Sequence, residues 1–210
     1  MTFNSVSQTK QELIKIGKLM GEKNFTPGYS GNISARLNNN EILISTSGSA
    51  NGYLDENDLT IMDYNGISLE EGKKPSSEKK LHIEFYKQRP DINYILHVHS
   101  PFLSSFASAG KHLLDPIMAE NVYYFKGIPL AEYGLPSSDD LVTKTAKFFK
   151  EYDAVLMKNH GVIIGSATLK DAYLKLELAE QYAQVVLNTY ILGGASLLTP
   201  EQTQEILNLR

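Results

Sequence analysis

Two histidines separated by a single valine, His97 and His99, stand in the otherwise mostly apolar run from Ile92 to Ser100. This run predicts a β-strand, in which side chains alternate between the two faces of a sheet. Both imidazoles therefore project from the same face, with their Cα atoms about 6.5–7 Å apart. Two imidazoles at that spacing can bind one cation, and the alternative is a pair of ordinary polar side chains at the end of a strand.

The composition is typical of one well-filled globular core. The chain has 210 residues, of which 42% are hydrophobic, and we expect a single domain over 1–210. Charged residues make up 21% of the chain, and the formal net charge is −4. This balance does not favour a nucleic acid or an anionic membrane surface as a partner.

The chain contains no cysteine, which excludes a disulfide framework and a cysteine-based zinc module. The first ten residues are polar and lack the apolar core of a signal peptide. No stretch approaches the ~20 apolar residues of a membrane span. We therefore expect a cytoplasmic protein.

Helical and strand periodicities alternate along the chain. Helices are predicted over 8–24, 77–88, 101–109 and 169–192, with two more that begin at 138 and at 200. Strands are predicted over 33–37, 41–45, 59–64, 67–69, 92–100, 154–157 and 162–164, with further short strands in 122–130. Strands joined by hairpins and interspersed with helices favour a partly antiparallel sheet between helical layers.

Two further side chains could complete a cation site. His160 follows the apolar strand 154–157 and precedes Gly161, which lets the backbone bend beside a ligand. An ordinary loop histidine is the alternative. Glu78 opens the helix over 77–88 and could be a ligand, a general base or an acid that favours the helix dipole.

The donor types indicate the kind of cation. Three histidines, one carboxylate and no cysteine favour a catalytic cation over a structural one. Zinc is the first expectation, and the same ligands accept manganese or cobalt. As a Lewis acid, such a cation can polarise a carbonyl and stabilise an enediolate.

Three loops rich in small polar residues could bind an anion. Ser76 and Ser77 precede Glu78 at a helix N-terminus, where free N–H groups and partial positive charge favour phosphate. A plain serine N-cap is the alternative. Gly31-Asn32 and Thr46-Ser47-Gly48-Ser49 also offer backbone N–H groups, and neither matches a nucleotide-binding glycine motif.

The two remaining histidines are not expected to bind a cation. His82 lies on the apolar face of its helix, which indicates a core histidine. Because it follows Glu78 by one helical turn, a supporting role behind that carboxylate is the alternative. His112 lies in a polar loop and is expected at the surface, and Lys158 is expected to have a surface or structural role rather than to form a Schiff base.

Five motifs, in this order, resemble the class II aldolase/adducin family, and most closely its branch of L-fuculose-1-phosphate aldolases. They are Gly31-Asn32-Ile33-Ser34, Ser45-Thr46-Ser47-Gly48, Pro75-Ser76-Ser77-Glu78 with His82, His97-Val98-His99-Ser100 and Asn159-His160-Gly161. One such motif would be a weak signal, but five in register over nearly the whole chain are specific to the family. The resemblance implies an α/β fold, a three-layer α/β/α sandwich around a largely antiparallel sheet. It also implies a homotetramer with active sites between subunits.

The resemblance also assigns roles to individual residues. It implies one zinc ion per subunit with the ligands His97, His99, His160 and Glu78, and it makes Glu78 a base as well. It implies that the substrate phosphate is held by Asn32, Ser47, Gly48, Ser76 and Ser77. Tyr133 is similar to the family tyrosine that reaches into a neighbouring subunit as an acid/base.

The expected activity is that of a zinc-dependent lyase. It would cleave a ketose 1-phosphate, L-fuculose 1-phosphate or a similar sugar, reversibly to dihydroxyacetone phosphate and an aldehyde through a metal-stabilised enediolate. A pentulose-5-phosphate 4-epimerase and a methylthioribulose-1-phosphate dehydratase are alternatives on the same scaffold. An alternative of another class is a non-catalytic interaction module like the adducin head, which predicts a degraded set of metal ligands.

Overall fold

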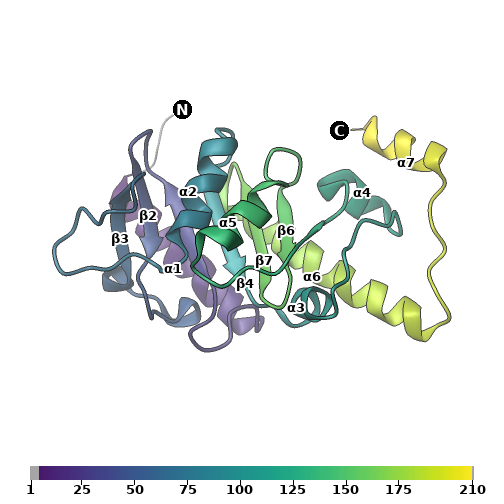
Figure 1. Cartoon of the computed structure of the whole chain (residues 1–210), viewed down its shortest axis with the longest axis horizontal. Coiled ribbons are helices and arrows are strands. Elements are labelled where there is room, and N and C mark those ends of the chain that lie inside the picture. Colours follow the sequence, from purple (N-terminus) through teal and green to yellow (C-terminus); the bar gives the residue numbers. More distant parts are fainter. Residues whose placement is uncertain (1–4, 210) are drawn as a thin grey trace.

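The computed structural model describes residues 5–209, and a single mixed sheet lies at its centre (Figure 1). The order of its seven strands is β3-β2-β1-β4-β7-β6-β5. The strands are β1 (Asn32–Arg36), β2 (Glu41–Ser45), β3 (Leu59–Asp63), β4 (Tyr94–Val98), β5 (Leu130–Ala131), β6 (Ala154–Met157) and β7 (Gly161–Ser166). All neighbouring strands are antiparallel except β5 and β6, which are parallel.

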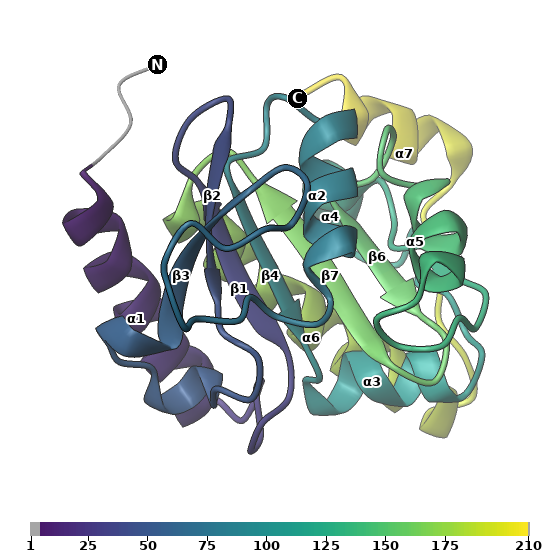
Figure 2. The same cartoon turned by 60° about the vertical axis from the view of Figure 1, so that its left-hand side comes forward.

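Helices cover both faces of this sheet (Figures 1 and 2). The helices are α1 (Val6–Glu22), α2 (Lys79–Gln88), α3 (Pro101–Ser108), α4 (Ala119–Phe125), α5 (Asp139–Ala146), α6 (Leu169–Ile191) and α7 (Pro200–Leu207), with 3-10 turns at Asn51–Tyr53 and Glu56–Asp58. One apolar core joins α1, α3 and α6 to the sheet, and a second joins α2 and α5 to its other face. The expected α/β/α sandwich with a largely antiparallel sheet is confirmed.

The pairing of the central strands sets the surroundings of the first histidine. His97 lies in β4, opposite Asn32 of β1 on one side and opposite Ile163 of β7 on the other. The turn between β6 and β7 therefore comes close to the end of β4. Residues that are 65 or more positions apart in the sequence become neighbours through backbone pairing alone.

One strand prediction is wrong over most of its length, and a second is wrong. Within 122–130, where short strands are predicted, the chain first completes helix α4; Ile128 then forms an isolated bridge with Leu113, and the short strand β5 begins at Leu130. The aromatic and β-branched residues of α4 favour strands intrinsically, but Val122 and Phe125, three residues apart, are both buried. Burial of one helical face therefore overrides the local preference. Residues 67–69 form only the isolated bridge Met62–Ser68 with β3 and no strand.

The boundaries of two elements near the histidines also differ from those expected. Helix α2 begins at Lys79 with Glu78 at its N-cap, so Ser77 is not the capping residue. Instead, the hydroxyl of Ser76 accepts a hydrogen bond from the backbone N–H of Glu78 at 3.3 Å. Strand β4 ends at Val98, so His99 lies one residue beyond it.

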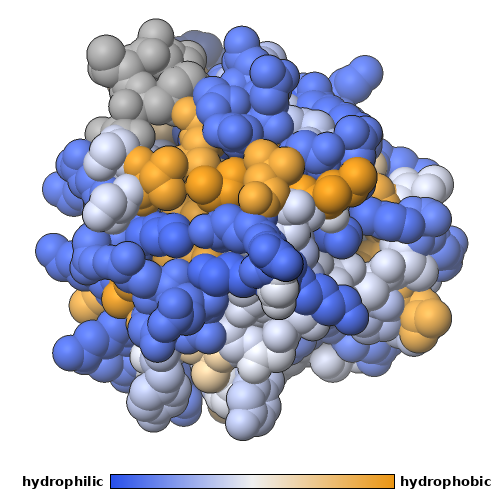
Figure 3. Space-filling view, turned by 90° about the vertical axis from the view of Figure 1, so that its left-hand side faces the viewer, coloured by the Kyte–Doolittle hydropathy of each residue, from blue (hydrophilic) through white to orange (hydrophobic). Residues whose placement is uncertain are grey.

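The sheet edge at β3 carries apolar surface. Figure 3 shows a band of apolar side chains across the end of the molecule at which β3 and α1 lie. In the segment after β3, Ile67 is 62% exposed and Leu69 is 53% exposed. None of the helices within residues 5–209 combines the length and the apolar character that a membrane-crossing segment requires.

Candidate metal centre

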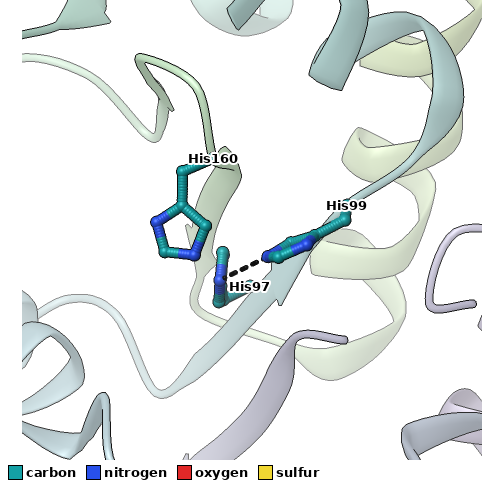
Figure 4. Close-up of side chains that lie close together, drawn as sticks. All are labelled: His97, His99 and His160. Carbon is teal, nitrogen blue, oxygen red and sulfur yellow. Dashed lines mark hydrogen bonds between the residues drawn. The ribbon is translucent and has the colours of Figure 1, made fainter. Parts of the chain in front are cut away.

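The structure brings His97, His99 and His160 together, and their ligand atoms all lie within 4.8 Å of one another (Figure 4). His97 comes from β4, His99 follows the end of that strand, and His160 lies in the turn between β6 and β7. The Nε2 atoms of His97 and His99 are 3.1 Å apart. His97 is fully buried, whereas His99 and His160 are partly accessible.

Glu78 adds a carboxylate to the three imidazoles. One of its oxygens lies 3.1 Å from His97 Nε2, and the other lies 3.4 Å from His160 Nε2. The second oxygen, Oε1, is buried and has no hydrogen-bond partner. Glu78 reaches the site because it is the residue at which α2 begins. The four predicted ligands therefore form one cluster.

The backbone determines which nitrogen of His97 can bind a cation. Its Nδ1 lies 2.9 Å from the carbonyl oxygen of Val162, which can only accept a hydrogen bond. Nδ1 therefore carries a proton, and in the neutral ring the lone pair is on Nε2, the atom that faces His99 and Glu78. A hydrogen bond of this kind fixes the tautomer of a metal-binding histidine.

The four groups also perturb one another's ionisation. Burial alone would raise the pKa of Glu78, but His97 and His160 outweigh this and hold that pKa well below its usual range. Burial would lower the pKa of His97, but the Glu78 carboxylate outweighs this and raises it. Burial and the charge on His97 lower the pKa of His99 to about 3 and that of His160 to about 4. At neutral pH, His99 and His160 are thus neutral and able to act as ligands.

The distances fit a small divalent cation. Ligand atoms about 2.0–2.1 Å from a tetrahedral zinc ion lie roughly 3.3 Å from one another. Three of the observed separations are close to this value: 3.1 Å between His97 and His99, 3.1 Å between His97 and Glu78, and 3.4 Å between His160 and Glu78. The ligand atoms of the three histidines all lie within 4.8 Å of one another. Oε1 of Glu78 has no hydrogen-bond partner, and a bound ion would supply it with one. The donor set of three nitrogens and one carboxylate suits zinc.

Gly161 gives the turn that carries His160 its close approach to β4. The preceding Asn159 has a left-handed φ of 57°. A Cβ atom on Gly161 would lie 2.4 Å from the carbonyl oxygen of Val98 and 2.8 Å from the His99 ring. Any larger residue at this position must therefore displace the backbone of β4 or the imidazole of His99.

We expect Gly161→Ala to weaken zinc binding by roughly 10–100-fold, the usual effect of disturbing the support of a ligand, and to lower stability by about 1–3 kcal/mol through overpacking. Gly165→Ala in the same strand is the matched control, because the atoms nearest to its Cβ would belong to the side chains of Ile92 and Phe85. Zinc titration against a chelating dye, with thermal unfolding of both variants, measures the two effects. Equal zinc affinity in the two variants would contradict the prediction.

A cleft of about 320 Å³ opens above these side chains. His99, His160 and Glu78 line it, and so do all the residues predicted to bind phosphate: Asn32, Ser47, Gly48, Ser76 and Ser77. Gly31 also lines it and has a φ of 74°, and a Cβ there would lie 2.3 Å from the carbonyl oxygen of His97. A larger cavity of about 870 Å³ between α1 and the start of α6 contains none of the predicted site residues.

Sequence reasoning missed part of the lining. Tyr29, Ser30, Thr46, Ser49, Pro136 and Ser137 also face the cleft. Thr46 and Ser49 belong to a loop singled out for its small polar residues, whereas Pro136 and Ser137 come from the segment before α5. Ser137 has a left-handed φ of 67°. Nothing in its local sequence signals that this loop folds back over the histidines.

The other candidate residues lie outside the cleft. Tyr133 is 48% exposed and does not line the cavity of its own chain. Lys158 pairs with Glu132 at 3.3 Å. His112 is exposed, as expected for a surface histidine, and His82 is fully buried.

The chain resembles known proteins over most of its length. The family model described as the Class II Aldolase and Adducin N-terminal domain matches residues 11–187. An L-fuculose phosphate aldolase of Methanocaldococcus jannaschii is 34% identical over 85% of this chain and 95% of its own length. A solved structure of an L-fuculose 1-phosphate aldolase, 30% identical, superposes with a TM-score of 0.90 and covers 98% of this chain and 97% of its own.

Relatives with other activities have similar coverage. A 5-deoxy-D-ribulose 1-phosphate aldolase of Bacillus thuringiensis serovar kurstaki is 31% identical over 96% of this chain and 94% of its own length. A 3-oxo-tetronate 4-phosphate decarboxylase of Haemophilus influenzae is 28% identical over 95% of this chain and 96% of its own length. The similarity therefore extends to phosphorylated sugar and sugar-acid substrates and to two kinds of carbon–carbon bond cleavage.

Proposed function

We propose that this chain, which belongs to the class II aldolase and adducin family, is an aldolase acting on a ketose 1-phosphate. It would cleave L-fuculose 1-phosphate or a similar sugar reversibly to dihydroxyacetone phosphate and an aldehyde. The observation that carries this proposal is the cleft itself, where a cluster of three histidines and one carboxylate meets an array of hydroxyl and amide donors. The expected location is the cytoplasm.

The proposed cofactor is one divalent cation per subunit, zinc first and manganese or cobalt as alternatives. His97, His99, His160 and Glu78 would hold it. When bound, the cation supplies Lewis-acid stabilisation of the negative charge that develops on the substrate's carbonyl and hydroxyl oxygens.

The phosphate end of the substrate is proposed to lie against Asn32, Ser47, Gly48, Ser76 and Ser77. Three serines, an asparagine and a glycine thus line this part of the cleft, and together they offer hydroxyl, amide and backbone N–H donors. The N-terminus of α2 adds partial positive charge behind Ser76 and Ser77. The donors would anchor the dianion and place the neighbouring carbon atoms over Glu78 and the histidines.

Glu78 and Tyr133 are the proposed proton carriers. During cleavage, a base takes the proton of the C4 hydroxyl, the C3–C4 bond breaks, and the aldehyde leaves. The electron pair of that bond stays with the ketone fragment. Glu78 would take up a proton from water in the cleft and pass it to C3, which gives dihydroxyacetone phosphate and returns Glu78 to its ionised form. Because Tyr133 does not line its own cleft, its role as the base at the C4 hydroxyl requires a second subunit, as in the proposed homotetramer.

The test is a substrate panel with coupled detection of dihydroxyacetone phosphate. We expect L-fuculose 1-phosphate or 5-deoxyribulose 1-phosphate to release it. Ribulose 5-phosphate and methylthioribulose 1-phosphate report the epimerase and dehydratase alternatives. 3-Oxo-tetronate 4-phosphate is included because a decarboxylase is among the relatives. Release of carbon dioxide from that compound, with no dihydroxyacetone phosphate from any ketose, would overturn the aldolase proposal in favour of a decarboxylase.

Metal analysis separates these enzymes from a non-catalytic module. All four candidate ligands are present and clustered, so we expect close to one equivalent of metal per chain after purification without chelators. Protein with no stoichiometric metal and no turnover on the panel would support the interaction module instead.

A further inference from the structure

A chain of buried hydrogen bonds leads from Glu78 into the layer between the sheet and α2. The amide nitrogen of Asn32 donates to Glu78 Oε2 at 3.0 Å, and Asn32 Oδ1 contacts His82 Nε2. His82 Nδ1 lies 2.7 Å from the hydroxyl of Ser34, which lies 2.8 Å from the hydroxyl of Tyr86. His82, Ser34 and Tyr86 are at most 1% exposed. Water therefore cannot replace a missing partner in this chain.

The carboxylate at the end of this chain determines the direction of the bonds from Asn32 to Ser34. An ionised carboxylate only accepts hydrogen bonds, so Asn32 must present its NH₂ group to Glu78 and its oxygen to His82. His82 must then donate from Nε2, which leaves Nδ1 as an acceptor. The Ser34 hydroxyl must donate to that Nδ1 and can accept from Tyr86. The donors of Ser34, His82 and Asn32 are thus directed toward Glu78. The Tyr86 hydroxyl lies 2.8 Å from Ser34 and also 3.3 Å from the carbonyl oxygen of Asn93, so its proton points to Ser34 only if the shorter contact prevails.

The opposite tautomer of His82 would break this arrangement. With its proton on Nδ1, the ring would offer a lone pair at Nε2 and favour an Asn32 amide turned by 180°. The Asn32 oxygen would then face the Glu78 carboxylate, and two acceptors would be in contact. Burial lowers the pKa of His82 to about 3. The ring is therefore neutral at neutral pH, and only its Nε2-protonated tautomer is compatible with an Asn32 amide that donates to Glu78.

We propose that His82 is a positioning residue for the proton-carrying carboxylate. Through the amide of Asn32 it directs a donor at one oxygen of Glu78, leaving the other oxygen, Oε1, beside His160. This inference rests on the proposed function, in which Glu78 moves a proton at the substrate carbon. It concerns a residue that contacts neither the histidine cluster nor the cleft.

Three variants and a control test the inference in the metal-loaded enzyme. His82→Phe removes both hydrogen bonds and keeps a planar ring, and we expect kcat to fall roughly 10–100-fold while KM changes less. His82→Gln retains an N–H donor for Asn32 and is expected to recover most of the loss. Ser34→Ala removes the donor to Nδ1 and is expected to cause a smaller loss. Phe85→Leu, on the same helix but stacked on Phe149, should lower thermal stability without lowering kcat.

A second measurement uses the metal-free wild-type protein and does not depend on turnover. Long-range ¹H–¹⁵N spectra of the histidine rings should show His82 with its proton on Nε2 and no titration between pH 5.5 and 8. In Asn32→Ala the Nε2 proton should lose its protection from solvent exchange. The spectra of the wild-type protein determine the tautomer of His82 even if the His82→Phe variant does not fold.

The outcomes distinguish this inference from the proposed function. A wild-type enzyme that releases dihydroxyacetone phosphate, with His82→Phe within twofold of its kcat, would overturn the positioning role alone. A His82 ring protonated on Nδ1 would overturn it as well. Failure of the wild type on the whole substrate panel, with the Nε2 tautomer observed, would count against the proposed function while supporting the hydrogen-bond chain.

Discussion

Removal of the metal is expected to abolish cleavage of the ketose 1-phosphate, and added zinc is expected to restore it. In the proposed mechanism, the metal ion as a Lewis acid stabilises the negative charge of the transition state by several kcal/mol. A loss of that size lowers the rate about a thousandfold or more. Dialysis against a chelator, followed by assay of dihydroxyacetone phosphate with and without added zinc, manganese or cobalt, measures both the loss and the preferred ion.

The same experiment separates metal catalysis from Schiff-base catalysis. A lysine mechanism would continue after chelation and would leave a covalent adduct after borohydride is added with substrate. Lys158, the lysine beside His160 in the sequence, instead pairs with Glu132 and does not line the cleft. We expect the mass of the protein to be unchanged by borohydride and substrate. Activity that persists in metal-depleted protein, or a trapped adduct, would refute the proposed mechanism.

Replacement of Glu78 by glutamine is expected to lower kcat by about 10²–10⁴, the range typical of losing a general acid/base. The amide keeps the shape of the side chain and one oxygen, which can still accept from Asn32. It cannot carry the proton that the substrate carbon requires. We therefore expect Glu78→Gln to keep much of its metal through His97, His99 and His160.

The control for this variant is Glu84→Gln, on the same helix but hydrogen-bonded to Gln88 and absent from the lining of the cleft. Its kcat should equal that of the wild type. Metal content by mass spectrometry and kcat at saturating zinc are measured for both variants. Full turnover by Glu78→Gln would refute the proton-carrying role, whereas loss of metal together with activity would show that Glu78 acts mainly as a ligand.

Local sequence signals located most of the elements around the site. The alternation in 92–100, the apolar run at 154–157 and the serine at 138 correspond to β4, β6 and the N-cap of α5 in the structure. They succeeded because each reports burial or capping within one short segment. The prediction of strands in 122–130 failed over 122–125, because the packing of α4 against α6 and α7, distant in sequence, outweighs the strand preference of its residues.

The sequence by itself determined the chemistry available to this protein: three imidazoles, one carboxylate, no thiol, and small polar loops suited to phosphate. These are properties of residue types and of short motifs.

Only the tertiary structure decided which atoms meet. The pairing of β4 with β1 and β7 places Asn32 and the His160 turn beside His97. The start of α2 adds Glu78, and the hydrogen-bond chain behind it turns the buried His82 into a support for that carboxylate. Periodicity reports which face of an element is buried, but it carries no information about which distant side chain will lie against that face.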